Sequence, residues 1–423
     1  MNPKLYAIQE DRKKVALPGG ATLLSQTLPS ALSVSMGVWI RSGSRHEEGR
    51  LQGISHFLEH MVFKGSRNRS AFEIASCLDR LGGQLDAFTS KESTCFSARV
   101  LAEHFDTAID LLSDLLHNAL LEPEMLELEK MVVVEEIRGV TDDPNDWIHD
   151  LASEEIFGEH PLAQPILGNE ESVLSFSAED VRQWMKKRYS ADRLVIAVAG
   201  PLTHEEVFSR VQDHFPRTAA GDVDRDFPSP SKPHKSFRHV SRDLKQQHLW
   251  LGRRGMSFHD PRRYGMFLLS TILGGSMSSR LFQEIRERSG LAYSVYSHAD
   301  FASDTGTLGT SMAVSPKRRK EALGRTLDEF QKLAREGCGE QELEDAKAQL
   351  KGSLLLSMES IPGRMARLAR NELSYGRFLE LEEIVEGVDS VQAGTLQELA
   401  EEFLDPESLS LVSIGPNEER SPF

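Results

Sequence analysis

The residues with the clearest chemical potential in this sequence are His56, Glu59 and His60, in the run His-Phe-Leu-Glu-His. Positions i, i+3 and i+4 of a helix share one face, so both imidazoles can reach one cation while the carboxylate points at the same place. Two neutral histidines suit zinc, and a carboxylate beside a zinc-bound water is the general base of metal-assisted hydrolysis. Alone, the motif is only a hypothesis, because a histidine on an apolar helix is commonly a core or surface residue.

The His-Phe-Leu-Glu-His motif must lie on one helix, and we expect the third metal ligand on a second helix. Around the motif, Gly53 opens a helix that apolar residues fill and that closes at Lys64-Gly65. A longer helical stretch begins at Pro123, where proline suits the first turn, and Gly139 and Pro144 mark its end. We therefore look for the third ligand on this second helix.

Two acids of the second helix are candidates for work at the metal. Glu129 and Glu136 lie two turns apart, on the face that also carries Val132 and Val133. A carboxylate on an apolar face is costly to bury unless it is paired or binds a metal. Glu135 is rotated by about 100° and is expected to be an ordinary solvated acid. Without the histidine motif, Glu136 would count as one more acid in an acid-rich helix.

The order H-x-x-E-H reverses the common zincin motif and is the inverzincin signature. With a glutamate at position 136, the chain resembles the pitrilysin-like metallopeptidases. It is most similar to the branch of the mitochondrial processing peptidase β subunit and its bacterial relatives. The resemblance covers nearly the whole chain and includes residues 56–65, 81–90, 165–168 and 290–294.

This resemblance implies roles for the residues of both helices. One zinc ion per chain would be held by His56, His60 and Glu136, with Glu59 as the general base. Glu129, one heptad before the third ligand, would contact a ligand rather than the metal itself. The implied activity is that of a zinc endopeptidase.

The segment Ala87-Phe88-Thr89 is expected to bind substrate. Residues 84–100 alternate apolar and polar around a turn near Ser90, which predicts two antiparallel strands. In the resembling enzymes the first of these is an edge strand, to which the peptide adds as a further strand through main-chain hydrogen bonds. This chain has Asp86 where many relatives have asparagine. Without the resemblance, the segment would be an ordinary edge strand.

Arg286 and Tyr293 resemble a pair in the second domain of the family. That pair holds the substrate backbone and helps to polarise the scissile carbonyl, a task that a guanidinium and a phenol can perform. Taken without the resemblance, Tyr293 is an aromatic residue of a strand and Arg286 an exposed charge of a helix.

The fold class expected is α+β, with two similar domains that form half of a clam-like chamber. Each domain would be a mostly antiparallel sheet with helices packed on one face. Residues 1–215 form the metal-binding domain, 216–237 a linker rich in proline, and 238–423 a similar substrate-binding domain without metal. Apolar residues 266–269 of the second half stand where the first half has its ligands, which indicates an internal duplication.

Composition excludes several classes of protein. The 423 residues are 39% hydrophobic and 27% charged, as in ordinary soluble proteins, and no apolar run is long enough for insertion into a membrane. The net charge of −16 argues against nucleic acid as a partner. The first residues lack a signal or transit pattern, and three scattered cysteines give no disulfide framework, so we expect a cytoplasmic protein.

The acidic charge bears on the expected substrate, and the family resemblance bears on the expected assembly. Acids that line a cavity would attract basic peptides, although a solvated acidic surface explains the charge equally well. Two-domain chains of this family pair into a chamber, so a dimer is implied. A homodimer would be self-sufficient, and a heterodimer stays open. The alternative function is that of a non-catalytic scaffold or partner subunit of a processing peptidase, although such subunits typically lose ligands or the base.

Overall fold

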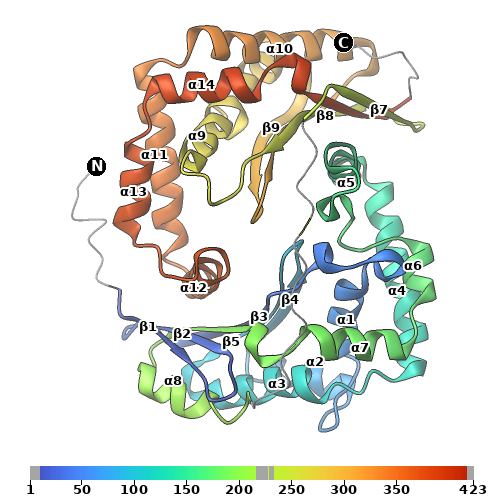
Figure 1. The fold of residues 1–423 in the computed structure, drawn as a ribbon, viewed down its shortest axis with the longest axis vertical. Coiled ribbons are helices and arrows are strands. Elements are labelled where there is room, and N and C mark those ends of the chain that lie inside the picture. Colours follow the sequence, from blue (N-terminus) through green and yellow to red (C-terminus); the bar gives the residue numbers. More distant parts are fainter. Residues whose placement is uncertain (1–9, 216–226, 228–232, 417–423) are drawn as a thin grey trace.

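The computed structural model describes residues 10–215, 227 and 233–416, and most of the predicted linker therefore lies outside the described residues. The chain forms two α+β units, one above the other in Figure 1, each built on one sheet. The second sheet already begins at Ser236, inside the segment predicted as linker. The expected fold class, two similar domains with mostly antiparallel sheets, is confirmed.

The sheet of the first domain has six strands, and only the β2–β6 pair is parallel. In spatial order they are β1 (Arg12–Ala16), β2 (Thr22–Thr27), β6 (Leu194–Gly200), β3 (Ser33–Ile40), β5 (Thr94–Leu101) and β4 (Gln84–Thr89). β6 is buried at every position, as expected of a central strand covered on both faces. β4 instead alternates between exposed and half-buried side chains and forms one edge of the sheet.

Helices cover one face of this sheet and enclose its main core. They are α1 (Ile54–Val62), α2 (Ala71–Asp79), α3 (Phe105–Asn118), α4 (Pro123–Asp142), α6 (Glu170–Ser175), α7 (Ala178–Arg188) and α8 (His204–Val211). α4 passes through Gly139 and ends at Asp142, so Pro144 and not Gly139 marks the boundary. Pro144 instead starts the next helix, whose N-terminus is capped by Asp143 through the Asn145 amide.

The second sheet repeats the order of the first without its outermost strand. Its strands are β7 (Ser236–Ser241), β11 (Ser410–Gly415), β8 (Gln247–Gly255), β10 (Gly306–Val314) and β9 (Ala292–Phe301). Again only one pair is parallel, β7 with β11, and the edge strand β9 is third in chain order, as β4 is when β1 is left out. The helices of this domain are α9 (Arg263–Gly274), α10 (Arg319–Glu336), α11 (Glu340–Ser357), α13 (Leu381–Asp389) and α14 (Ala393–Phe403).

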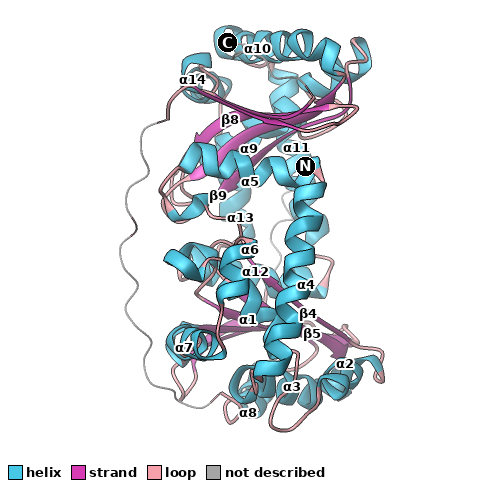
Figure 2. Cartoon of the chain, turned by 90° about the vertical axis from the view of Figure 1, so that its right-hand side faces the viewer, coloured by secondary structure: helices cyan, strands magenta, loops and turns pink. Residues whose placement is uncertain are grey.

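Each domain lends one helix to the other, an arrangement that the sequence did not predict. α5 (Pro144–Phe157) packs Ile148 and Leu151 against Trp250 of the second sheet. α12 (Ile361–Tyr375) packs Leu368 against Trp39 of the first sheet. Figure 2 shows α5 beside the second sheet and α12 beside the first domain. The opposite faces of both sheets are therefore partly covered by the other domain.

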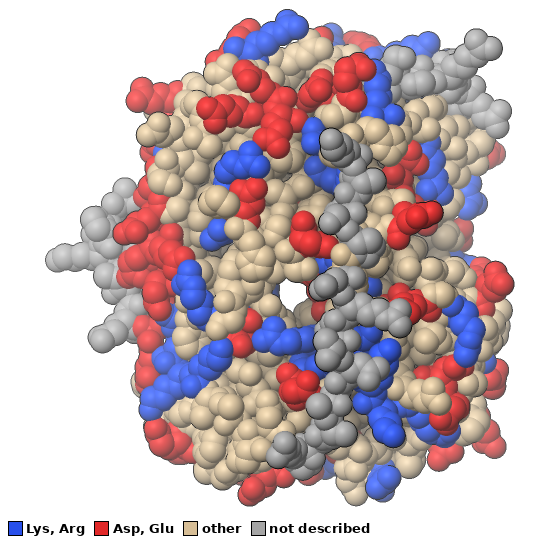
Figure 3. Space-filling model, viewed as in Figure 1, with Lys and Arg blue, Asp and Glu red and all other residues tan. Residues whose placement is uncertain are grey.

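The two domains leave an opening between them, which passes through the molecule in the view of Figure 3. Among the described residues, every helix is too short or too polar to cross a membrane.

Candidate metal centre

The metal-binding helix α1 begins at a tight turn. Gly53, which caps it, has φ of 89°, and an added Cβ would lie 2.3 Å from the carbonyl oxygen of Leu167. Both carboxylate oxygens of Glu47 accept hydrogen bonds from the start of the helix, from the Gly53 amide at 2.6 Å and the Ser55 amide at 2.8 Å. Burial raises the pKa of Glu47 to about 7, against the effect of these two bonds.

Three side chains converge where α1 packs on α4. The Nε2 atoms of His56 and His60 lie 3.6 and 3.5 Å from Oε2 of Glu136. Ligand atoms of a tetrahedral zinc site, with bonds of about 2.1 Å, are separated by roughly 3.4 Å. Within residues 10–215, 227 and 233–416, no other group of three or more His, Cys, Asp or Glu side chains brings its ligand atoms within 4.8 Å. The donor set and spacing fit a zinc ion.

The protonation of the two histidines differs. Burial, and secondly the charge of His60, lowers the pKa of His56 to about 3, so His56 is neutral, as a metal ligand must be. Burial alone would lower the pKa of His60, but its hydrogen bond to Glu129 and the nearby carboxylate of Glu136 raise it. The 2.8 Å bond from Nδ1 to Glu129 fixes the ring and directs Nε2 toward Glu136.

Glu129 is buried next to the metal ligand His60. It is 3% exposed and also pairs with Lys64 at 2.8 Å. Burial opposes its ionisation, but the bonds from His60 and Lys64 lower its pKa below the ordinary value. Of the two valines assigned to its helix face, Val132 is 51% exposed, whereas Val133 is fully buried. The open side of this face is the side of Glu136, whose side chain is 43% exposed.

Glu59 touches the strand predicted to bind substrate. The hydroxyl of Thr89 donates to Oε2 of Glu59 at 2.5 Å. Burial raises the pKa of Glu59, and the Thr89 bond opposes this shift. Ala87 packs against the core below the helices, while Phe88 pairs with Cys95 on the opposite face and is 48% exposed. The base and the edge strand are thus in direct contact.

Arg286 and Tyr293 also lie together, in the second domain and outside the cluster of metal ligands. The guanidinium carbon of Arg286 lies 4.8 Å from the centre of the Tyr293 ring. Tyr293 is 80% exposed near the start of edge strand β9. Arg286 belongs to a π-helical segment, Phe282–Arg288, and such segments often occur at functional sites.

Comparison with known proteins identifies the family. A model described as insulinase (peptidase family M16) matches residues 22–170, and one described as peptidase M16 inactive domain matches residues 175–350. An uncharacterized zinc protease of Bacillus subtilis is 40% identical, over 96% of this chain and 99% of its own length. Another, of Streptomyces coelicolor, is 37% identical over 96% and 89%. The structure of a protease from Helicobacter pylori matches with a TM-score of 0.90 and 21% identity, over 96% of this chain and 99% of that chain.

The chain therefore belongs to peptidase family M16, and the pitrilysin-like resemblance is confirmed. The description of the second matching model as an inactive domain agrees with the second domain itself. There, α9 presents buried Met266, Leu268 and Leu269, and no ligand cluster is found among the described residues.

Two contacts of this site were missed from the sequence, those of Glu47 and Lys64. Glu47 precedes the motif in an irregular segment, where no periodicity marks a functional residue. Lys64 was assigned only to the end of the helix.

Proposed function

We propose that this protein is a zinc-dependent endopeptidase that hydrolyses peptides or unfolded segments. The observation that carries the proposal is the convergence of His56, His60 and Glu136 beside Glu59. When bound there, zinc would polarise the scissile carbonyl and lower the pKa of a water molecule. The names of the relatives, which are zinc proteases, support the same chemistry.

In this proposal the chain's own residues handle the proton and the ligands. The carboxylate of Glu59 accepts the proton of the attacking water and passes it to the leaving amine. Its raised pKa brings it closer to neutral pH, where a carboxyl can both accept and return a proton. Glu129 holds the ring of His60, and Thr89 holds the carboxylate of Glu59 in place.

The substrate would pair with edge strand β4 along Ala87, Phe88 and Thr89. An edge strand offers unpaired backbone groups, so an extended peptide gains main-chain hydrogen bonds with little demand on its side chains. The net charge of −16 supports a preference for basic peptides.

We further propose a homodimeric chamber located in the cytoplasm. Both the metal ligands and the Arg286/Tyr293 pair are present in one chain, so two copies would need no other subunit. Tyr293 is exposed and lies in the other domain from α1, which suits assistance to the metal site of the partner subunit. The three cysteines are free, as expected of a reducing compartment.

Cleavage of a quenched fluorescent basic peptide tests the proposal. The purified protein is assayed as prepared, after treatment with a chelator, and after zinc is restored. We expect cleavage that the chelator abolishes and zinc recovers. Absence of cleavage by the zinc-loaded protein, or cleavage unaffected by complete removal of metal, would contradict the proposal.

A further inference from the structure

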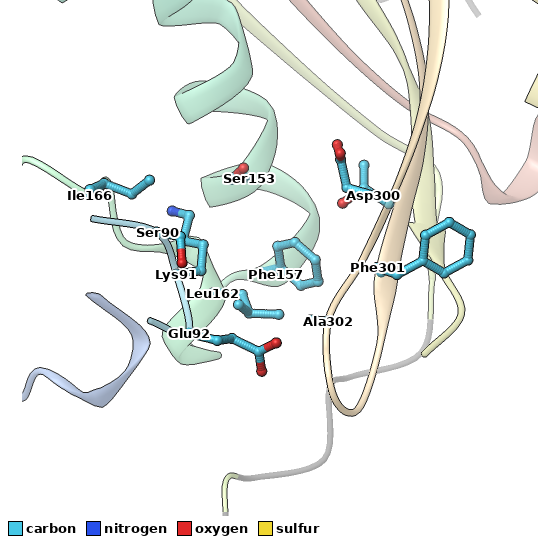
Figure 4. Close-up of a pocket in the computed structure, with 12 residues that line it drawn as sticks. Ser90, Lys91, Glu92, Ser153, Phe157, Leu162, Ile166, Asp300, Phe301 and Ala302 are labelled. Carbon is cyan, nitrogen blue, oxygen red and sulfur yellow. The ribbon is translucent and has the colours of Figure 1, made fainter. Parts of the chain in front are cut away.

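Two hairpin turns, one from each domain, meet between the domains. Glu92 lies in the β4–β5 turn, and Ser303 lies in the β9–β10 turn. Glu92 accepts hydrogen bonds from the Ser303 hydroxyl at 2.6 Å and from the Ser303 amide at 3.2 Å. Both turns border an interdomain pocket of about 360 Å³, and Figure 4 shows Glu92 beside the hairpin that carries Ala302. The edge strands β4 and β9 are thus joined at their turns.

Arg45 contacts both of these turns through its side chain. Its side chain is fully buried and pairs with Glu92 at 2.5 Å and with both carboxylate oxygens of Asp304 at 3.1 and 2.7 Å. A fourth bond, at 3.0 Å, reaches the Ser303 hydroxyl. A guanidinium that meets two carboxyl side chains in a fixed, forked geometry makes strong and directional bonds. His160 adds a contact of 3.3 Å to Asp304.

The residues beside Arg45 contact both the β4–β5 turn and the metal-binding helix α1. The amides of Ser44 and Arg45 donate to the carbonyl oxygens of Ser90 and Lys91, at 3.1 and 2.9 Å. The approach is so close that a Cβ on Gly43 would lie 2.2 Å from the Ser90 oxygen. Two residues after Arg45, Glu47 caps α1.

The contacts form a continuous path to the general base. Arg45 fixes the turn that starts at Ser90, and Thr89, the residue before that turn, donates to Glu59. The path begins at Asp304 in the second domain, so its contacts connect both domains to strand β4.

We propose that Arg45 is a positioning residue, which ties the two turns together and keeps edge strand β4 ordered beside the metal helix before substrate arrives. This inference rests on the proposed function, because it assigns β4 as the strand to which the peptide adds. An ordered strand lets the peptide bind without first arranging its partner. Loss of the tie therefore raises KM, while kcat changes little once the peptide itself orders the strand.

The test uses Arg45→Lys, which keeps the charge but loses the fork, and Glu92→Gln, which keeps the shape but loses the charge. The control is Lys14→Ala. Lys14 pairs with Glu372 of the second domain at 2.6 Å, but on β1, at the opposite edge of the same sheet. For each full-length protein we measure zinc content, kcat and KM for the fluorescent peptide, and hydrogen exchange of residues 84–93 without substrate.

If the strand is ordered in only about a tenth of the variant molecules, KM rises about tenfold. We expect this rise, faster exchange over residues 84–93 and unchanged zinc content for Arg45→Lys and Glu92→Gln, but not for Lys14→Ala. Unchanged KM and exchange in the Arg45 and Glu92 variants would overturn the inference, as would equal changes in the control.

The comparison remains informative if one variant does not fold or if the wild-type protein does not cleave peptides. If Arg45→Lys does not fold, Glu92→Gln, whose side chain is partly exposed, gives the same comparison from the turn itself. If the wild-type protein does not cleave peptides, the proposed function fails, but the exchange measurement still decides whether the tie orders the strand.

Discussion

The two domains share one strand order but differ in what they place on it. In the first, β2-β6-β3-β5-β4 ends in edge strand β4; in the second, β7-β11-β8-β10-β9 ends in edge strand β9. The helix that follows β3 in the chain is α1, and the helix that follows β8, at the same place in the second series, is α9. α1 carries His56, Glu59 and His60, whereas α9 carries buried apolar residues.

The difference between α1 and α9 distinguishes the residues that the fold requires from those that the metal site requires. α9 shows that the scaffold forms with an apolar helix in this position, and polar groups are costly to bury. The proposed function therefore predicts that the histidines and acids clustered on α1 and α4 serve chemistry and not stability. Their removal should affect metal and activity far more than the fold.

The largest effect is expected from His60→Ala. This change removes one ligand and leaves Glu129, which also pairs with Lys64, without the imidazole that it orients. Zinc content and cleavage should both fall to background, as measured by metal analysis and the peptide assay. His104→Ala, outside the cluster, serves as the control, and zinc bound at wild-type level by the His60 variant would show that the site is elsewhere.

Glu59→Gln should separate metal binding from catalysis. The amide cannot accept the proton of the attacking water, so kcat is expected to fall by roughly 10²–10⁴-fold, the usual contribution of a general base. Zinc content should stay at the wild-type level, because Glu59 is outside the ligand set. Turnover close to that of the wild type would contradict the role given to this residue.

Glu129→Gln should weaken zinc binding without abolishing it. An amide loses the charge that holds the ring of His60 and pairs with Lys64, and such outer contacts typically contribute about 10–100-fold to metal affinity. Competition with a chelator of known affinity measures the change. Glu135→Gln, an exposed acid of the same helix that pairs with Arg138, is the matched control and should bind zinc as the wild type does.

Glu47→Gln should change how stability depends on pH. Burial raises the pKa of Glu47 from 4.5 to about 7, so the folded chain holds this proton more tightly than the unfolded chain. The resulting stability is complete below about pH 4.5 and is lost as the pH rises through about 7, and it amounts to up to about 3 kcal/mol. Glutamine does not titrate. The free energy of unfolding of the wild type, minus that of the variant, should therefore decrease between pH 4.5 and 7 in denaturant titrations. An increase over this range would show that the ionised cap is the favoured form.

Local patterns predicted much of this molecule. Alternation predicted β4 and β5, because this signal depends on neighbours in the sequence. The spacing of His56, Glu59 and His60 predicted one face of one helix for the same reason. The placement of Glu136 beside them needed the family resemblance, since nothing in the sequence says how α4 packs on α1.

The remaining features depend on contacts between distant segments. The exchange of α5 and α12 between the domains joins residues such as Leu368 and Trp39, and no periodicity identifies such partners. The same holds for Arg45 with Asp304, and for Glu47 with the amides of α1. Each pairs a charge with a partner that only the folded chain brings close.

The most direct test of the central claim is a crystal of the zinc-loaded protein measured at the zinc absorption edge. We expect one anomalous peak per chain, bonded to His56, His60 and Glu136, and none in the second domain. A peak bonded to other residues, or no peak in crystals of protein that contains zinc, would contradict the central claim.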